Sequence, residues 1–291
     1  MNGDFFDALR VGTERIAAWA DLLDSINVFP IADGDTGRNL LISLLPLKSF
    51  VRDRSVLTEK LFLAARGNSG NIAAQFFTGF LSYGNTVQFT DAVQTGTRRA
   101  WQAIADPQPG TMLSVFDELE RSLIESTMDR QGAWVPGVLK RLESAVLETA
   151  QTLPILKSAH VVDSGALGMF IFFDAFLNAL YLRAPRFAPI SAVFREHLAV
   201  KGAWGTHRAS RVSRDKDGSG DMESGTCVDA VVKFKNGEQK SIGDLSMLGA
   251  SLVSQEYGGC VKIHIHTSDQ SAIRNVLSRE GSIIQWASTS I

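Results

Sequence analysis

Apolar residues recur at spacings of three and four along the first 185 residues, which is the period of amphipathic helices. In the segment 5–26 this spacing brings Phe5, Leu9 and Ile16 onto one side of a helix. Another helix is predicted from Thr90, as its N-cap, to Ile104. The same pattern predicts helices over 57–65, 71–82, 112–128, 136–152 and 166–182. Because no convincing strand pattern interrupts them, the first domain is predicted to be all-α.

The pattern changes after residue 185. Residues 201–225 are rich in glycine, serine and charged side chains, which is typical of a linker or mobile loop. Beyond them, Asn236-Gly237 indicates a hairpin turn, and residues 268–280 are predicted to form a helix. Strands are predicted over 227–234, 239–244, 248–253, 261–267 and 282–287. We therefore predict a multi-domain α and α+β protein, with an all-α domain at 1–185, a linker at 186–225 and a small α+β domain at 226–291.

The composition is that of an ordinary globular protein, with 45% apolar and 21% charged residues. The net charge of −2 provides no positive field for nucleic acid or an anionic membrane. Two cysteines favour a reducing compartment, and the acidic start of the chain is unlike a signal peptide, so a cytoplasmic location is expected. Asp174 and Asn178 interrupt the apolar run 167–182, which indicates a buried helix and no transmembrane segment.

The densest candidate chemistry lies in the segment 27–39, where Asp33 and Asp35 flank Gly34. Magnesium prefers oxygen ligands and is usually held by one or two carboxylates together with substrate phosphates. Gly34 lets the backbone tighten so that both carboxylates can face one cation, and Gly37 would permit the close approach of a phosphate. A solvated Asp-Gly turn between two helices is the simpler alternative for this motif alone.

Three further glycine-containing segments precede predicted helices: 66–70, 109–112 and 162–166. Free backbone N–H groups and the helix dipole favour an anion at such a helix start. Each segment on its own is more simply an N-cap. Four polar helix starts in one all-α domain suggest that the loops gather at one end and form a single phosphate-binding rim.

In this order and spacing, N-V-F-P-x-x-D-G-D-T-G-x-N, A-R-G-N-S-G, P-G-T-M and V-V-D-S-G-A-L-G resemble the nucleotide-binding domain of bacterial fatty acid kinase. That domain is similar to the nucleotide-binding L subunit of dihydroxyacetone kinase. The resemblance covers about residues 5–185 and implies an antiparallel eight-helix barrel whose loops hold ATP and magnesium. It implies that Asp33 and Asp35 are catalytic magnesium ligands. The residues implied to surround the nucleotide are Thr36, Gly37, Asn39, Asn68, Ser69, Gly70, Thr111, Met112, Asp163 and Gly165.

The chain departs from these families at several positions. The dihydroxyacetone kinase pattern has a third metal aspartate where this chain has Val28. Either Asn27 or Asp24 replaces that ligand, or the metal arrangement differs. Arg38 and Asn71 stand where fatty acid kinases usually have small or apolar residues. They contact phosphate or a partner, or they lie in solvent.

A second candidate site lies in the predicted strand 260–267. Because side chains alternate along a strand, His264 and His266 share one face with Cys260 and Lys262. Two histidines spaced by two can converge on one metal ion, although two half-buried structural histidines are an equal alternative. Cys260 lies about 13 Å along the strand from His264, at about 3.3 Å per residue, so it is a poor ligand. The resemblance to the middle domain of fatty acid kinases implies a zinc site of Cys227, His264 and His266.

The leading hypothesis is an ATP-dependent kinase that phosphorylates the carboxylate of a fatty acid presented by a separate binding protein. A dihydroxyacetone-type kinase and a nucleotide-binding regulatory module without turnover are the alternatives. The longer fatty acid kinases continue into a third domain that this chain lacks, so it is either a short natural form or a fragment. A homodimer remains open.

Overall fold

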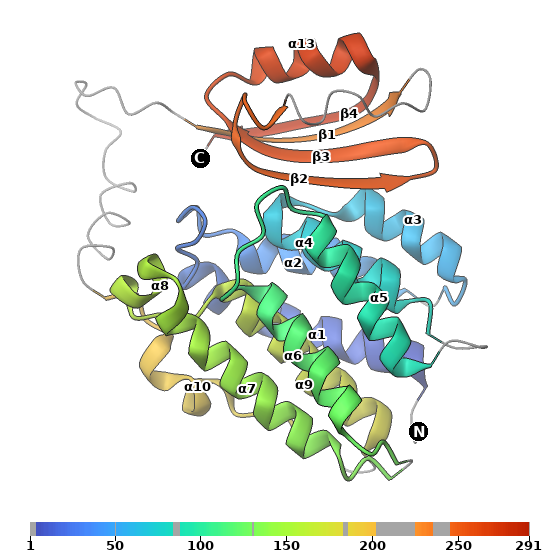
Figure 1. Cartoon of the computed structure of the whole chain (residues 1–291), viewed down its shortest axis with the longest axis vertical. Helices are drawn as coiled ribbons and strands as arrows, with labels where there is room; N and C mark the ends of the chain where they lie inside the picture. The colour runs from blue at the N-terminus through green and yellow to red at the C-terminus, as the bar shows by residue number, and fades with distance from the viewer. Residues whose placement is uncertain are drawn as a thin grey trace.

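The computed structural model describes residues 4–49, 51–83, 88–129, 131–182, 186–201, 225–234 and 245–290 (Figure 1). In this part of the chain the protein is mostly helical, with one small antiparallel sheet near the C-terminus. The helical segments before the sheet are α1 Phe5–Ser25, α2 Thr36–Leu44, η1 Leu45–Lys48, α3 Arg54–Ala64, α4 Gly67–Phe80, α5 Phe89–Gln102, α6 Met112–Glu125, α7 Val135–Thr152, α8 Pro154–Ala159, α9 Ser164–Tyr181, α10 Ile190–Val193 and η2 Arg195–His197. The remaining elements are β1 Thr226–Phe234, β2 Ala250–Tyr257, β3 Cys260–Thr267, α13 Gln270–Glu280 and β4 Gly281–Ser290.

The long helices contact one another in a closed order. Along this order, α1, α2, α4, α5, α6, α7 and α9 each touch the next, and α9 returns to α1. α3 lies against α2 and α4. The helix starts agree with the predicted ones to within a few residues, although α5 begins at Phe89 with Gln88, not Thr90, as its N-cap. The eight-helix barrel is not confirmed by this arrangement and stays a prediction.

α9 is the core helix of the domain. It is the one helix of the described ranges that is long and apolar enough to cross a membrane by length and composition, and 94% of it is buried inside the protein. Phe173 on α9 packs edge-on against Phe76 of α4, and Phe76 stacks on Phe116 of α6 with a centroid distance of 4.1 Å. Such aromatic pairs fill the interior and leave α9 as a packed core element, as its sequence predicts.

Residues 186–201 correct the predicted domain boundary. The predicted linker includes them because the helical pattern of the sequence ends at residue 185, but Ile190 and Phe194 are fully buried in the helical core. His197 O accepts a hydrogen bond from Val162 N at 3.3 Å, which ties η2 to the segment before α9. The helical domain therefore extends to about residue 201, because two apolar residues are enough to anchor a short segment. The rest of the predicted linker, 202–224, lies outside the described residues.

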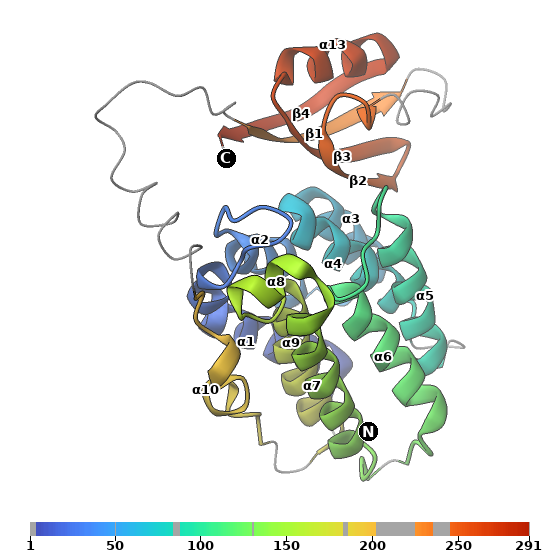
Figure 2. The ribbon, with the colours of Figure 1, turned by 60° about the vertical axis from the view of Figure 1, so that its left-hand side comes forward.

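The sheet has the strand order β2-β3-β1-β4, and all its pairs are antiparallel. One face packs against α13, where Ile273 and Leu277 join Val228, Ile263 and Ile265 in a second apolar core. The opposite face is turned toward the helical domain (Figures 1 and 2). The predicted hairpin at Asn236-Gly237 and the predicted strand 239–244 lie outside the described residues.

Candidate active site

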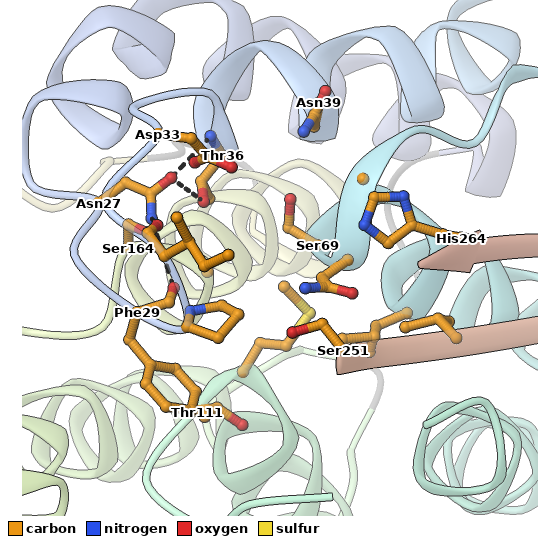
Figure 3. A pocket seen from close by; sticks show the side chains of 18 of the residues that line it. Asn27, Phe29, Asp33, Thr36, Asn39, Ser69, Thr111, Ser164, Ser251 and His264 are labelled. Carbon is orange, nitrogen blue, oxygen red and sulfur yellow. Dashed lines mark hydrogen bonds between the residues drawn. The ribbon is translucent and has the colours of Figure 1, made fainter. Parts of the chain in front are cut away.

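A cavity lies between the helical domain and the sheet. The starts of α2, α4, α6 and α9 line one side of it, through Thr36, Ser69, Met112 and Ser164. β1, β2 and β3 line the other side (Figure 3). The four helix starts are therefore gathered at one rim, as their polar, glycine-containing sequences predict.

Nearly all the candidate residues line this single cavity. From the helical domain it is lined by Asp33, Asp35, Thr36, Asn39, Asn68, Ser69, Thr111, Met112, Asp163 and Gly165, and from the sheet by Cys227, His264 and His266. The two candidate sites, which the sequence presents as separate, thus form opposite walls of one space. Their roles in binding remain predictions.

Gly37 and Gly70 are corrections to the predicted phosphate contacts. Neither lines the cavity. A Cβ on Gly37 would lie 2.0 Å from the carbonyl oxygen of Ala20 on α1, and one on Gly70 would lie 2.0 Å from Ser43 Oγ on α2. Both glycines are required because two helices approach closely at these points, so their contribution is to helix packing.

Asn27 organises the loop that carries the two carboxylates. Its side-chain amide donates to Phe29 O at 3.3 Å and Ile31 O at 3.0 Å. Its Oδ1 accepts from the Thr36 hydroxyl at 2.9 Å and from the Asp35 and Thr36 amides, both at 3.3 Å. With its donors and its acceptor engaged in this way, Asn27 holds the loop around the cavity, although it also lines the wall.

Asp24 and Arg38 support the start of α2. Asp24 Oδ1 accepts from the Gly37 and Arg38 amides at 2.7 and 3.2 Å, and Asp24 Oδ2 pairs with Arg38 Nε at 2.9 Å. Arg38 also donates to Gly34 O at 3.0 Å. Asp24 therefore satisfies free N–H groups of a helix start, and it does not line the cavity. Val28, at the position of the third aspartate, is buried in the helical core.

The electrostatics of the Asp33–Asp35 pair favour a cation. Burial, together with the negative charge and hydrogen bonding of Asp35, raises the pKa of Asp33 to about 7. Two carboxylates this close cannot both ionise freely without a compensating positive charge. A divalent ion would supply that charge, and oxygen-rich carboxylate sites suit magnesium.

The start of α4 has the features of an anion site. Among the described residues, no side chain caps this helix, and Gly67 adopts a left-handed conformation with φ of 59°. A 14-residue helix directs its unsatisfied N–H groups and its positive dipole end into the cavity here.

Asp163 caps α9 and is buried, accepting the Ala166 amide at 2.7 Å. Burial raises the pKa of its carboxyl from 3.8 to about 7. Protonation of Asp163 therefore stabilises the fold, and this stabilisation is fully present below about pH 4 and lost as the pH rises through 7.

Asp163→Asn keeps a cap acceptor but cannot ionise. We expect its free energy of unfolding in urea to exceed that of the unmodified chain by roughly 1–4 kcal/mol at pH 8 and to match it near pH 4.

Asp53→Asn is the matched control for this measurement. Asp53 caps α3 in solvent, and the hydroxyl of Ser55 and the amides of Val56 and Ser55 hold its pKa below the usual value. Its ionisation therefore favours the folded state, and Asp53→Asn should give no gain in stability at pH 8. Equal unfolding free energies for Asp163→Asn and the unmodified chain at pH 8 would show that the charge of Asp163 does not destabilise the fold.

The candidate metal ligands of the sheet converge. The register places Cys227 opposite His266, and the ligand atoms of Cys227, His264 and His266 lie within 4.8 Å of one another. His264 Nε2 lies 3.1 Å from His266 Nε2, and Cys227 Sγ lies 3.6 Å from His264 Nδ1 and 4.0 Å from His264 Nε2. A tetrahedral zinc separates two nitrogens by about 3.3 Å and a sulfur from a nitrogen by about 3.6 Å. The three side chains therefore fit a zinc ion.

Asp229 supports this cluster. Its Oδ1 lies 3.2 Å from His264 Nδ1, the nitrogen turned away from His266. Although burial raises the pKa of Asp229, its hydrogen bond and charge interaction with His264 outweigh this and hold it below the usual range. A carboxylate on the second nitrogen of a histidine orients the ring and fixes the tautomer for metal binding. Burial, and then the charge of His264, lowers the pKa of His266 to about 4, so its ring is neutral, the form that binds metal.

Charges on both walls of the cavity act on the Cys227 thiol. Burial, and then the negative charges of Asp229, Asp35 and Asp33, raise the pKa of the Cys227 thiol far above its usual range. Without a cation this sulfur stays protonated, whereas a bound metal would deprotonate it. Cys260 lies at the other end of β3, opposite Lys233 and Tyr257, and outside this cavity.

Two residues of the site escaped the sequence analysis. Asp229 shares the strand face of Cys227, and period-two alternation could have indicated it. Ser251 lines the cavity from β2 with φ of 56°, where the register of β2 shifts (Figure 3). A non-glycine residue in this conformation is strained and is often found at a functional site. Nothing in the sequence signals a left-handed serine.

Several known proteins are similar to this chain in sequence. A protein of Staphylococcus saprophyticus is 29% identical over 97% of this chain and 53% of its own length. The protein YloV of Bacillus subtilis is 28% identical over 97% of this chain and 54% of its own length. The chain thus spans about half the length of the curated relatives it matches. The family model of the DAK2 domain matches residues 30–178, a little more than half of the 291 residues. The chain belongs to the DAK2 domain family.

Proposed function

We propose that the protein transfers the γ-phosphoryl group of Mg–ATP to the carboxylate of a fatty acid that a separate binding protein presents. The observation that carries the proposal is the single cavity lined by Asp33, Asp35 and the start of α4 on one side and by Cys227, His264 and His266 on the other. Membership of a kinase-related domain family supports it.

In this proposal Asp33 and Asp35 hold the magnesium that neutralises the phosphates, and the start of α4 receives phosphate oxygens. Catalysis of phosphoryl transfer is mainly positioning and charge stabilisation. An acceptor carboxylate is ionised at neutral pH, so one of its oxygens can attack the γ-phosphorus without a general base. The bond from the γ-phosphorus to its bridging oxygen breaks, and ADP leaves with that electron pair.

The sheet would complete the site. Cys227, His264 and His266 would hold zinc, and a zinc ion with three protein ligands keeps a fourth position that an oxygen can take. Proximity of this position to the phosphate rim favours a role in the reaction over a purely structural one. The presence of the sheet wall, and of Val28 where a third aspartate is expected, also favours the fatty acid reading over a dihydroxyacetone-type kinase, which the DAK2 domain alone would suggest.

The test measures Mg–ATP binding and acyl-phosphate formation by the purified chain, the latter trapped with hydroxylamine. We expect the chain to bind Mg–ATP but to transfer phosphate to free fatty acid slowly or not at all, because aromatic side chains fill the helical core and leave no room for a long acyl chain. An acyl-carrying partner should restore transfer.

Other outcomes separate the alternatives. Rapid acyl-phosphate formation by the chain alone would remove the partner requirement. Transfer to a small ketose would favour the dihydroxyacetone-type reading. Tight Mg–ATP binding without transfer to any acceptor, with or without a partner, would leave a regulatory nucleotide-binding module.

A further inference from the structure

The contact between the sheet and the helical domain contains several buried polar groups. Gln255 of β2 is buried, and its Oε1 accepts from Gln75 Nε2 of α4 at 3.0 Å, while its amide nitrogen donates to Asn71 Oδ1. Arg99 Nε of α5 donates to Gln75 Oε1 at 3.1 Å. Asn71, predicted to meet phosphate, a partner or solvent, meets the sheet instead. Domain interfaces with this polar character resemble transient protein interfaces, so their closure needs specific contacts.

Lys262 of β3 makes the most unusual of these contacts. It is 1% exposed, and its ammonium donates to Phe62 O at 2.9 Å and Leu63 O at 3.1 Å. Both carbonyls belong to the last turn of α3. A buried ammonium is costly unless its donors have acceptors, and two helix carbonyls from the other domain accept from Lys262.

Those carbonyls need an external donor. The Arg66 amide, which would bond to Phe62 O if α3 continued, donates instead to Ser43 Oγ at 2.9 Å. The last carbonyls of a helix have no partner within the helix, and the negative end of the helix dipole attracts a cation. Lys262 therefore caps α3 at its C-terminus from the sheet.

This cap joins the two walls of the cavity. Lys262 lies two residues before His264 on β3, and α3 ends three residues before Gly67, where α4 and the candidate phosphate site begin. Figure 1 shows the sheet lying over α3 and α4. The lysine does not line the cavity itself. The contact therefore lies only a few residues along the chain from a candidate ligand on each wall.

We propose that Lys262 is a positioning residue that docks the sheet on the helical domain and thereby holds the His264–His266 wall at its working distance from the start of α4. The reaction described above, on which this proposal rests, then depends on docking, while Mg–ATP binding depends mainly on the helical domain. Removal of the Lys262 ammonium should therefore lower the reaction rate while Mg–ATP binding stays nearly unchanged.

Two backbone hydrogen bonds report docking directly: Ser254 N to Ala103 O at 2.9 Å and Ala105 N to Leu252 O at 3.1 Å. Hydrogen exchange of these two amides measures how often the interface opens. In the full chain with its metals, Lys262→Met should speed both exchange rates about tenfold, which is about 1.4 kcal/mol of opening free energy. Acyl-phosphate turnover should fall about tenfold or more, with the Kd for Mg–ATP changed less than twofold and zinc content unchanged.

Lys233→Met is the matched control, because Lys233 is an exposed lysine on the neighbouring strand β1. It should leave exchange and turnover unchanged. Gln255→Met removes a second side-chain docking contact and should reproduce the effects of Lys262→Met, which also covers the case in which the lysine variant fails to fold.

Exchange of Ser254 and Ala105 at unmodified rates in folded Lys262→Met would overturn the docking role. Faster exchange with full turnover in either docking variant would overturn the need for docking in the reaction. If the unmodified chain transfers phosphate to no acceptor, the proposed function fails, but the exchange rates still decide whether Lys262 docks the sheet.

Discussion

Asp33→Ala and Asp35→Ala should each lower phosphoryl transfer by about a thousandfold or more, ~4 kcal/mol of transition-state stabilisation, while the chain stays folded. The reason is the loss of a ligand for the magnesium that neutralises the phosphates. Stability should not fall, because burial and the charge of Asp35 already disfavour ionised Asp33 in the metal-free protein. Turnover at saturating magnesium tests the loss of transfer, and thermal unfolding of the same preparations tests the unchanged stability.

Two variants make this test specific. Asp21→Ala removes an exposed acid of α1 and should change neither property. Asp24→Ala removes the acceptor for the Gly37 and Arg38 amides and should lower stability by about 1 kcal/mol, with magnesium binding retained. Near-normal turnover by a folded Asp33→Ala, Asp35→Ala double variant would exclude this pair from the mechanism. Loss of magnesium from Asp24→Ala would make Asp24 the third ligand after all.

The purified chain should carry close to one zinc ion, and Cys227→Ser, His264→Ala or His266→Ala should each remove most of it. The three ligand atoms lie within 4.8 Å of one another, so each variant removes a third of the protein ligands. Cys260→Ser should retain the metal, because Cys260 pairs with Lys233 at the far end of the strand. Metal analysis after gel filtration measures this, and Asp229→Asn should weaken zinc about 10–100-fold by freeing the His264 ring.

Chelation gives a second view of the same site. Structural zinc can supply much of the folding energy of a small domain, so a chelator should loosen the sheet before the helical domain. Carefully prepared protein without zinc would return the histidines to a structural role. Equal zinc loss from Cys260→Ser and Cys227→Ser would show that the register of β1 against β3 is wrong.

Local sequence patterns anticipated the parts of the fold that local forces determine. The three- and four-residue spacing of apolar residues marks α1 and α9, because an amphipathic or fully apolar helix carries its own period. Strand alternation placed His264, His266 and Lys262 on one face of β3, which the structure bears out, since that face meets the helical domain. The Asp-Gly-Asp loop and the three other helix starts were also visible as polar, glycine-containing segments.

Contacts between distant segments were beyond such patterns. The end of the helical pattern at 185 placed residues 186–201 in a linker, yet Ile190 and Phe194 are buried, because whether an apolar residue is covered depends on what surrounds it in space. Gly37 was read as a phosphate contact, although the constraint on it is the approach of α1. The local sequence does not indicate which residues from distant parts of the chain will pack against a given residue.

By itself, the sequence determined the helical first part, the small sheet, the residue types of both candidate sites and the strand face that carries the histidines. Only the tertiary structure decided that both sites line one cavity, that Cys227 lies opposite His266, that Asp229 supports His264, and that Lys262 caps α3 from another domain. Periodicity and helix capping act over a few neighbouring residues. Juxtaposition depends on strand register and on domain packing, which arise from contacts between segments up to 200 residues apart, such as Lys262 and Phe62.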